Sequence, residues 1–109
     1  MTTIVLYRDD AGKLRGFRAS GHSGYEDKGR DIVCAAVSVL TINTINAIEA
    51  FTKDRPQVKS DEDMTIADFP DPPGKEAELL LKTYELGIRS IEQSYGDNVQ
   101  VEVRRYESC

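Results

Sequence analysis

Polar and hydrophobic residues alternate at both ends of the chain. The alternation in Thr2–Arg8 uses β-branched and aromatic residues, and a second such run covers Leu14–Ser20. Residues 9–12, Asp-Asp-Ala-Gly, are typical of a turn, so the two runs are predicted to form a β-hairpin. Valines at every second position of residues 99–103 predict a last strand with one buried face and one solvent-exposed face.

Two segments between these ends have apolar residues at helical spacing. In Ile32–Phe51 the predicted buried stripe consists of Val33, Val37, Leu40, Thr44, Ile48 and Phe51. In the second segment it consists of Leu80, Tyr84, Ile88, Ile91 and Tyr95. Each segment is therefore predicted to be an amphipathic helix, and Gly96 is predicted to end the second one in a left-handed conformation.

The segment between the two helices is mainly polar. Residues 60–63, Ser-Asp-Glu-Asp, interrupt it, and residues 64–66 predict one short strand. The order strand, strand, helix, strand, helix, strand predicts an α+β fold, in which two helices pack on one face of a mainly antiparallel sheet. With 109 residues, the chain is expected to form a single domain over residues 1–109.

Composition limits the kinds of partner. The formal net charge of −5 argues against direct nucleic-acid binding and favours a basic partner. We expect no apolar run near the roughly 18 residues of a membrane span and no secretory signal, which predicts a cytoplasmic protein without a membrane partner. One histidine and two cysteines predict neither a disulfide framework nor a zinc site, and no cofactor is expected. Cys109, at the chain end, is not expected to be catalytic.

The histidine and the other cysteine lie in one segment, residues 21–38, Gly-His-Ser-Gly-Tyr-Glu-Asp-Lys-Gly-Arg-Asp-Ile-Val-Cys-Ala-Ala-Val-Ser. If Asp31 caps the helix, Cys34 is its third residue, where unpaired amides and the helix dipole favour a thiolate. A thiolate attacks acyl carbon, and His22 is the natural acid for the leaving amine. The alternative is an inert Cys34 and a merely exposed His22, and the spacing alone does not exclude it.

Three supporting candidates each have two interpretations. Asp31 is either a helix cap or an acidic partner that orients His22. Ser38, one turn after Cys34, either faces the active site or bonds back to the Cys34 carbonyl. Gly21 either admits the backbone of a substrate or only ends the hairpin strand.

The segment resembles the ribosomal-processing cysteine protease family of bacteria. The resemblance rests on Gly-His at 21–22, the loop glycine and Asp-Ile-Val-Cys-Ala-Ala-Val-Ser at 31–38, and the order of elements follows the family over nearly the whole chain. It implies a cysteine endopeptidase in which His22 and Cys34 are the catalytic pair. The implied reaction removes the N-terminal extension of the twenty-seventh large-subunit ribosomal protein, beside a hydrophobic, phenylalanine-containing stretch. It also implies a homodimer.

Two other functions remain as alternatives to the protease. A non-catalytic ribosome-assembly module would bind the same extension and would keep its function without the sulfur of Cys34. A redox sensor based on Cys34 is disfavoured because no resolving cysteine lies close in the sequence.

Overall fold

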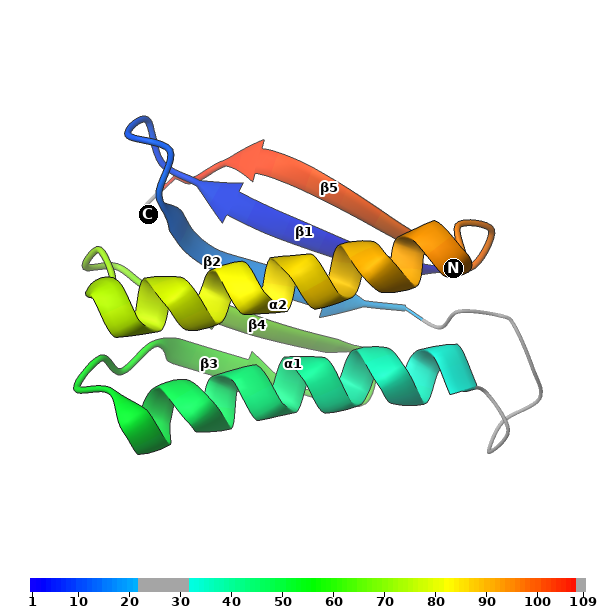
Figure 1. Cartoon of the computed structure of the whole chain (residues 1–109), viewed down its shortest axis with the longest axis horizontal. Helices are drawn as coiled ribbons and strands as arrows, with labels where there is room; N and C mark the ends of the chain where they lie inside the picture. The colour runs from blue at the N-terminus through cyan, green and yellow to red at the C-terminus, as the bar shows by residue number, and fades with distance from the viewer. Residues whose placement is uncertain (22–31, 108–109) are drawn as a thin grey trace.

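The computed structural model describes residues 1–21 and 32–107. Within them, five strands form one sheet and both helices lie on the same face of it (Figure 1). In chain order the elements are β1 (Thr2–Arg8), β2 (Leu14–Ser20), α1 (Ile32–Phe51), β3 (Gln57–Ser60), β4 (Met64–Asp68), α2 (Lys75–Ser94) and β5 (Val99–Arg105). The α+β fold predicted from the sequence is confirmed.

The sheet has the strand order β3-β4-β2-β1-β5 and is mixed. The pairs β1–β2, β2–β4 and β3–β4 are antiparallel, whereas β5 runs parallel to β1. The sequence predicted one strand between the helices, but the structure has a hairpin there, and the acidic residues 61–63 form its turn. The prediction lacked β3 because all four of its residues are exposed, so this edge strand carries no alternating burial pattern.

The core lies between the sheet and the two helices. Tyr84 of α2 packs against Phe17 of β2, with ring centroids 4.3 Å apart. The hydroxyls of Tyr84 and Thr41 are hydrogen-bonded at 2.9 Å, which joins α2 to α1 inside the core. Burial raises the pKa of Tyr84 and outweighs the opposing effect of the Thr41 hydrogen bond, so the phenol stays neutral.

The last turn of each helix differs from the sequence prediction, although the bounds of α1 agree with it. The buried residues of α1 are Val33, Val37, Thr41, Thr44, Ile45 and Ile48. Phe51 was predicted on this stripe but is 78% exposed, and the hydroxyl of Thr52 bonds to the carbonyl of Ile48 where the helix ends. Gly96 has no positive φ. Instead, Tyr95 ends α2 by donating its N–H to the Ile91 carbonyl.

The expectation that no segment is apolar enough to span a membrane is also wrong. Among the described residues, α1 has the length and composition of such a segment. The core helix of a soluble protein passes the same test, and Val33, Val37 and Ile48 of α1 belong to the core cluster. We therefore interpret α1 as a core helix.

The turns of the two hairpins lie at opposite ends of the sheet (Figure 1). Strand register pairs Thr3 with Ser20 and Ser20 with Met64, so the start of β1, the end of β2 and the start of β4 are side by side. The N-terminal half of α1 lies over this same end. These four segments enclose the candidate site.

Candidate active site

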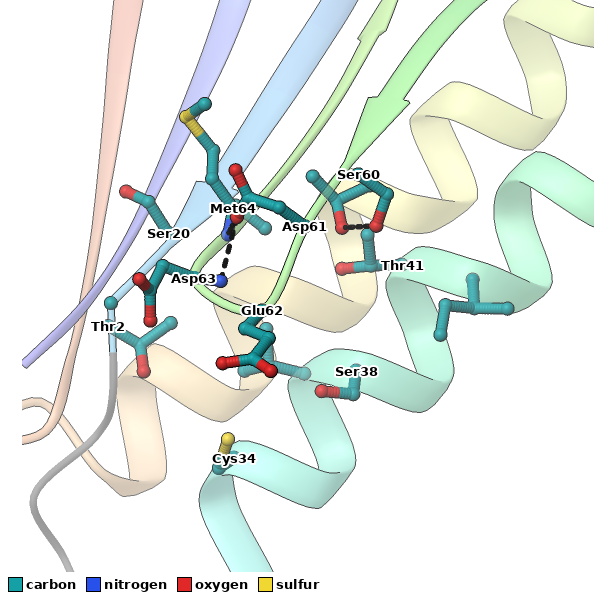
Figure 2. A pocket seen from close by; sticks show the side chains of 15 residues that line it. Thr2, Ser20, Cys34, Ser38, Thr41, Ser60, Asp61, Glu62, Asp63 and Met64 are labelled. Carbon is teal, nitrogen blue, oxygen red and sulfur yellow. Dashed lines mark hydrogen bonds between the residues drawn. The ribbon is translucent and has the colours of Figure 1, made fainter.

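Cys34 lies in the first turn of α1, which begins at Ile32. It is the third helical residue, so its backbone N–H has no acceptor within the helix. The side chain is half-buried, and its sulfur points from α1 toward the β3–β4 turn (Figure 2). The thiol is therefore accessible in the first turn of a helix, beside the β3–β4 turn.

Cys34 borders a pocket of about 190 Å³. Four segments form its walls: the start of β1, the end of β2, the N-terminal half of α1 and the β3–β4 turn (Figure 2). Its apolar lining residues are Ala19, Val37, Ile42 and Met64. Its polar lining includes Thr2, Ser20, Ser38, Ser60, Asp61 and Glu62. An apolar lining with convergent polar groups is typical of a ligand site.

Ser38 lines the same pocket as Cys34. One of its two interpretations was a hydrogen bond back to the Cys34 carbonyl, and no such bond occurs in the described part of the chain. Two hydroxyl side chains of α2 do bond to the carbonyl four residues earlier. Thr83 donates to Leu79 at 2.8 Å, and Ser90 donates to Leu86 at 3.0 Å. Ser38 thus has its hydroxyl available to the pocket, and a catalytic contribution stays a prediction.

Gly21 follows β2 with a φ of 84°, a conformation that favours glycine. A Cβ at this position would lie 2.6 Å from the carbonyl oxygen of Met1. The Gly21 N–H donates to the Asp63 carbonyl at 3.0 Å, which ties the end of β2 to the β3–β4 turn. Gly21 therefore permits close approach of the chain's own backbone, and admission of a substrate backbone stays a prediction.

His22 and Asp31 lie outside the described residues. The predicted pairing of His22 with Cys34, and both interpretations of Asp31, therefore stay predictions. Within residues 1–21 and 32–107, no three His, Cys, Asp or Glu side chains are grouped to hold a metal ion.

The β3–β4 turn is the part of the site that sequence reasoning missed. Asp61 shapes it: its Oδ1 accepts the N–H groups of Asp63 at 2.8 Å and Met64 at 2.9 Å. Below the turn, the hydroxyls of Ser60 and Thr65 are hydrogen-bonded at 2.9 Å across the two strands. An aspartate that accepts N–H groups two and three residues later is a known turn signal, so the acidic run contained the information needed to predict this turn.

The arrangement suits attack by sulfur on an acyl group bound in the pocket. The amide of Cys34 points out of the first helical turn and is a candidate donor to the oxyanion that forms. An accessible thiol in the first turn of a helix, beside a pocket, is typical of enzymes that use cysteine as a nucleophile.

Comparison with known proteins agrees with this class of enzyme. The model of the family described as cysteine protease Prp matches residues 1–100. The chain therefore belongs to the Prp family of cysteine proteases and is a hydrolase.

Two curated relatives cover nearly the whole chain. The ribosomal processing cysteine protease Prp of Staphylococcus aureus (strain NCTC 8325 / PS 47) is 31% identical over 104 residues, covering 93% of this chain and 97% of the relative. The protein of the same name from Bacillus subtilis (strain 168) is 30% identical over 107 residues, covering 93% and 96%.

Solved structures of the S. aureus protease have the same fold. Its complex with a covalently linked product peptide matches with a TM-score of 0.91 and 29% identity, over 95% of this chain and 100% of that one. Its complex with a substrate peptide matches with a TM-score of 0.86 and 28% identity, over the same shares. The fold is thus that of a protease known with peptides bound.

Proposed function

We propose that this enzyme removes the N-terminal extension of the twenty-seventh large-subunit ribosomal protein, with Cys34 as nucleophile and His22 as general base and acid. The observation that carries the proposal is the position of Cys34, half-buried in the first turn of α1 beside a pocket. Its relatives are ribosomal processing cysteine proteases, and one of them has been solved with a covalently linked product peptide.

The proposed reaction has two covalent steps. The Cys34 thiolate attacks the scissile carbonyl carbon, the C–N bond breaks, and protonated His22 gives its proton to the leaving amine. Water then attacks the thioester, His22 takes up the proton of that water, and the thiolate leaves from the new carboxylate. The Cys34 amide would stabilise the oxyanion in both steps.

The thiol position favours a protease over a non-catalytic ribosome-assembly module. A binding module needs contact surface but no nucleophile at a helix N-terminus. We further propose that the enzyme acts in the cytoplasm, where reducing conditions keep the thiol reduced, and that it is a homodimer, as the family resemblance implies. Light scattering on the purified protein tests the dimer.

Cleavage of the precursor ribosomal protein tests the main proposal. The wild type is expected to release the extension, seen by mass spectrometry as two products. Cys34→Ala and His22→Ala should each lower kcat/KM by about 1,000-fold or more, and the double variant should be no worse, because nucleophile and base act as a unit. Cys34→Ser should be nearly as inactive, since a helix N-terminus does not ionise a hydroxyl.

Ser90→Ala is the matched control. Its hydroxyl bonds within α2 and does not line the pocket, so normal cleavage is expected. Circular dichroism confirms that each variant is folded. A folded Cys34→Ala that releases the extension at the normal rate would end the proposal, and so would a wild type that binds the precursor without cleaving it.

A further inference from the structure

β3 is an edge strand of the sheet, and its hydrogen bonds show which of its backbone groups face outward. In an antiparallel pair, hydrogen-bonded positions alternate with positions that are not bonded. The Asp61 N–H donates to the Met64 carbonyl at 2.9 Å, so the residues two and four positions earlier also bond to β4. The N–H and C=O groups of Val58 and Ser60 therefore point away from β4, toward the open edge.

Two further contacts agree with this pattern. The Gly21 N–H donates to the Asp63 carbonyl at 3.0 Å, so alternate residues from Asp63 onward bond toward β2, and Thr65 is one of them. Ser60, the partner of Thr65, is thus at a non-bonded position, where facing side chains lie closest, and the two hydroxyls are 2.9 Å apart. In the described part of the chain β3 pairs with β4 alone, so no second strand takes up the outward groups.

The open edge of β3 continues into the pocket that Cys34 lines. Ser60 is one of the lining residues. The lining from α1 includes Cys34, Ser38 and Ile42, which are spaced four residues apart on one side of the helix. Figure 2 shows Ser60 on the β3–β4 hairpin, across the pocket from Cys34 and Ser38. The pocket therefore lies between this side of α1 and the end of the open edge.

Two exposed apolar side chains lie along this course. Ile42 of α1 is 54% exposed, and Val58 of β3 is 39% exposed. Val58 lies two residues before Ser60, so both side chains are on the same face of β3. Along α1, Ile42 is two helical repeats of four residues beyond Cys34, which corresponds to about 12 Å, or about three to four residues of an extended chain.

We infer that the substrate peptide binds as an additional strand beside β3, with backbone hydrogen bonds to Val58 and Ser60. An apolar side chain about three to four residues from the scissile bond would contact Ile42 and Val58. This inference rests on the proposed function, because the peptide is the one that Cys34 would cleave. An extended chain fits the open edge because its own N–H and C=O groups repeat every two residues, whereas a helical segment has paired its groups internally.

Backbone N-methylation of the peptide tests the pairing without altering the strand. The probes are fluorescein-labelled peptides that span the precursor cleavage site, each with one methylated amide, and they are titrated with the Cys34→Ala enzyme. In either strand direction, two peptide N–H groups, two residues apart, meet the carbonyls of Val58 and Ser60. Methylation of either amide should weaken binding about 10-fold, and methylation of the amide between them by less than about twofold.

Val58→Pro removes one outward N–H from the enzyme. Proline is tolerated on an edge strand where the N–H faces outward, so thermal stability should change little, while peptide affinity falls about 5- to 10-fold. Lys59→Pro is the matched control for stability. The Lys59 N–H is at a position that bonds to β4, so this variant should melt at a clearly lower temperature than Val58→Pro.

Ile42→Ser tests the apolar contact. It should weaken binding of the unmodified peptide about three- to fivefold. The loss should disappear with a peptide that has alanine at the position facing Ile42, since the two changes then remove the same contact. Val39→Ser is the matched control, because Val39 is 67% exposed on the same helix and does not line the pocket. It should leave affinity unchanged.

The outcomes distinguish this inference from the proposed function. Equal losses at every methylated amide, no loss at any of them, or a folded Val58→Pro enzyme that binds normally would overturn the added strand, while precursor cleavage by the wild type still supported the protease. Losses at alternate amides, together with a wild type that fails to cleave the precursor, would keep the peptide-binding edge and overturn the assigned reaction.

Discussion

The β1–β2 turn and the β3–β4 turn use the same local chemistry at opposite ends of the sheet. In the first, Asp9 Oδ1 accepts the N–H groups of Ala11 and Lys13, both at 3.0 Å. In the second, Asp61 Oδ1 accepts two N–H groups in a similar way. In both turns, the aspartate side chain accepts hydrogen bonds from backbone N–H groups of the turn, and these bonds shape it.

The two turns differ in what surrounds the aspartate. The other carboxylate oxygen of Asp9 contacts Arg15 at 3.3 Å. Arg15 is itself held by the carbonyls of Phe69 and Pro70, and its guanidinium lies 4.4 Å from the ring centroid of Tyr106. Through Arg15, the first turn is therefore joined to two other segments of the chain, one at residues 69–70 and one at Tyr106.

The second turn borders the pocket. Glu62 at its tip has no partner among the described residues, and neither has the nearby hydroxyl of Thr2. The comparison teaches that one turn motif can stand in two settings: the first turn is tied through Asp9 and Arg15 to the rest of the fold, whereas the second borders the pocket that Cys34 lines.

Alanine at a glycine near each turn should give the largest effect on stability. Gly12 and Gly21 have nearly the same φ, 83° and 84°, but a Cβ at Gly12 meets nothing within 4 Å, whereas at Gly21 it lies 2.6 Å from the Met1 carbonyl oxygen. Gly12→Ala should lower the free energy of unfolding by about 1 kcal/mol. Gly21→Ala should lower it by about 3 kcal/mol, because the backbone must also shift.

Urea denaturation of the two glycine variants measures this difference. Gly21→Ala should also lower peptidase activity, since the Gly21 N–H holds the pocket turn through Asp63. Equal destabilisation of the two variants would contradict the close approach as the cause.

Removal of the two turn aspartates should separate stability from activity. Asp9→Ala should lower the midpoint of thermal unfolding more than Asp61→Ala, because Asp9 also loses its contact with Arg15. Asp61→Ala should lower kcat/KM by about 10-fold, as the tip with Glu62 is no longer held in place, while Asp9→Ala changes kcat/KM by less than about twofold.

Asparagine replacements serve as controls for the aspartate variants, since asparagine keeps an Oδ1 acceptor for both backbone N–H groups. Asp61→Asn should therefore retain most of the activity. If Asp9→Ala and Asp61→Ala reduced activity equally, the division of roles between the turns would be wrong.

The smallest effect concerns the pH dependence of the first turn. The Lys13 N–H, with a further contribution from Arg15, holds the pKa of Asp9 below the value of 3.8 expected in the unfolded chain. The ionised form therefore stabilises the fold above that value, and this contribution is lost as pH falls through the lower, folded-state pKa. The difference in melting temperature between wild type and Asp9→Asn should stay constant from neutral pH to about pH 4 and narrow below it.

Arg15→Met provides the control for this pH experiment. In that background the narrowing should persist in weaker form, because the Lys13 N–H is the larger cause of the lowered pKa. A difference that stays constant until acid denaturation would refute the contribution of Asp9.

Much of the fold was predictable because buried apolar residues recur in the sequence with the period of a helix or a strand. The bounds of β1, β2 and α1 agree with the prediction, since each contains buried apolar residues at the spacing of its element. β3 was not predictable in this way because both of its faces are exposed. Phe51 misled the prediction because it has the right spacing but lies in the last turn of α1.

The site was predictable only where it follows from local sequence. The position of Cys34 in the first helical turn depends on its immediate neighbours. Thr2 and Glu62 were missed because the pocket brings together residues far apart in the chain through strand pairing. No pattern within one segment indicates that the first strand, the first helix and the second hairpin share a cavity.

The parallel pairing of β1 with β5 has a consequence for the order in which the molecule is completed. β1 leaves the ribosome before the other four strands of this sheet, yet its outer edge stays open until β5 has been made. The closing contact at the pocket end, from the Thr2 N–H to the Asn98 carbonyl, spans almost the entire chain. Such a long-range closure is slow relative to hairpin formation, so the nascent chain would complete this wall of the pocket only after β5 has been made.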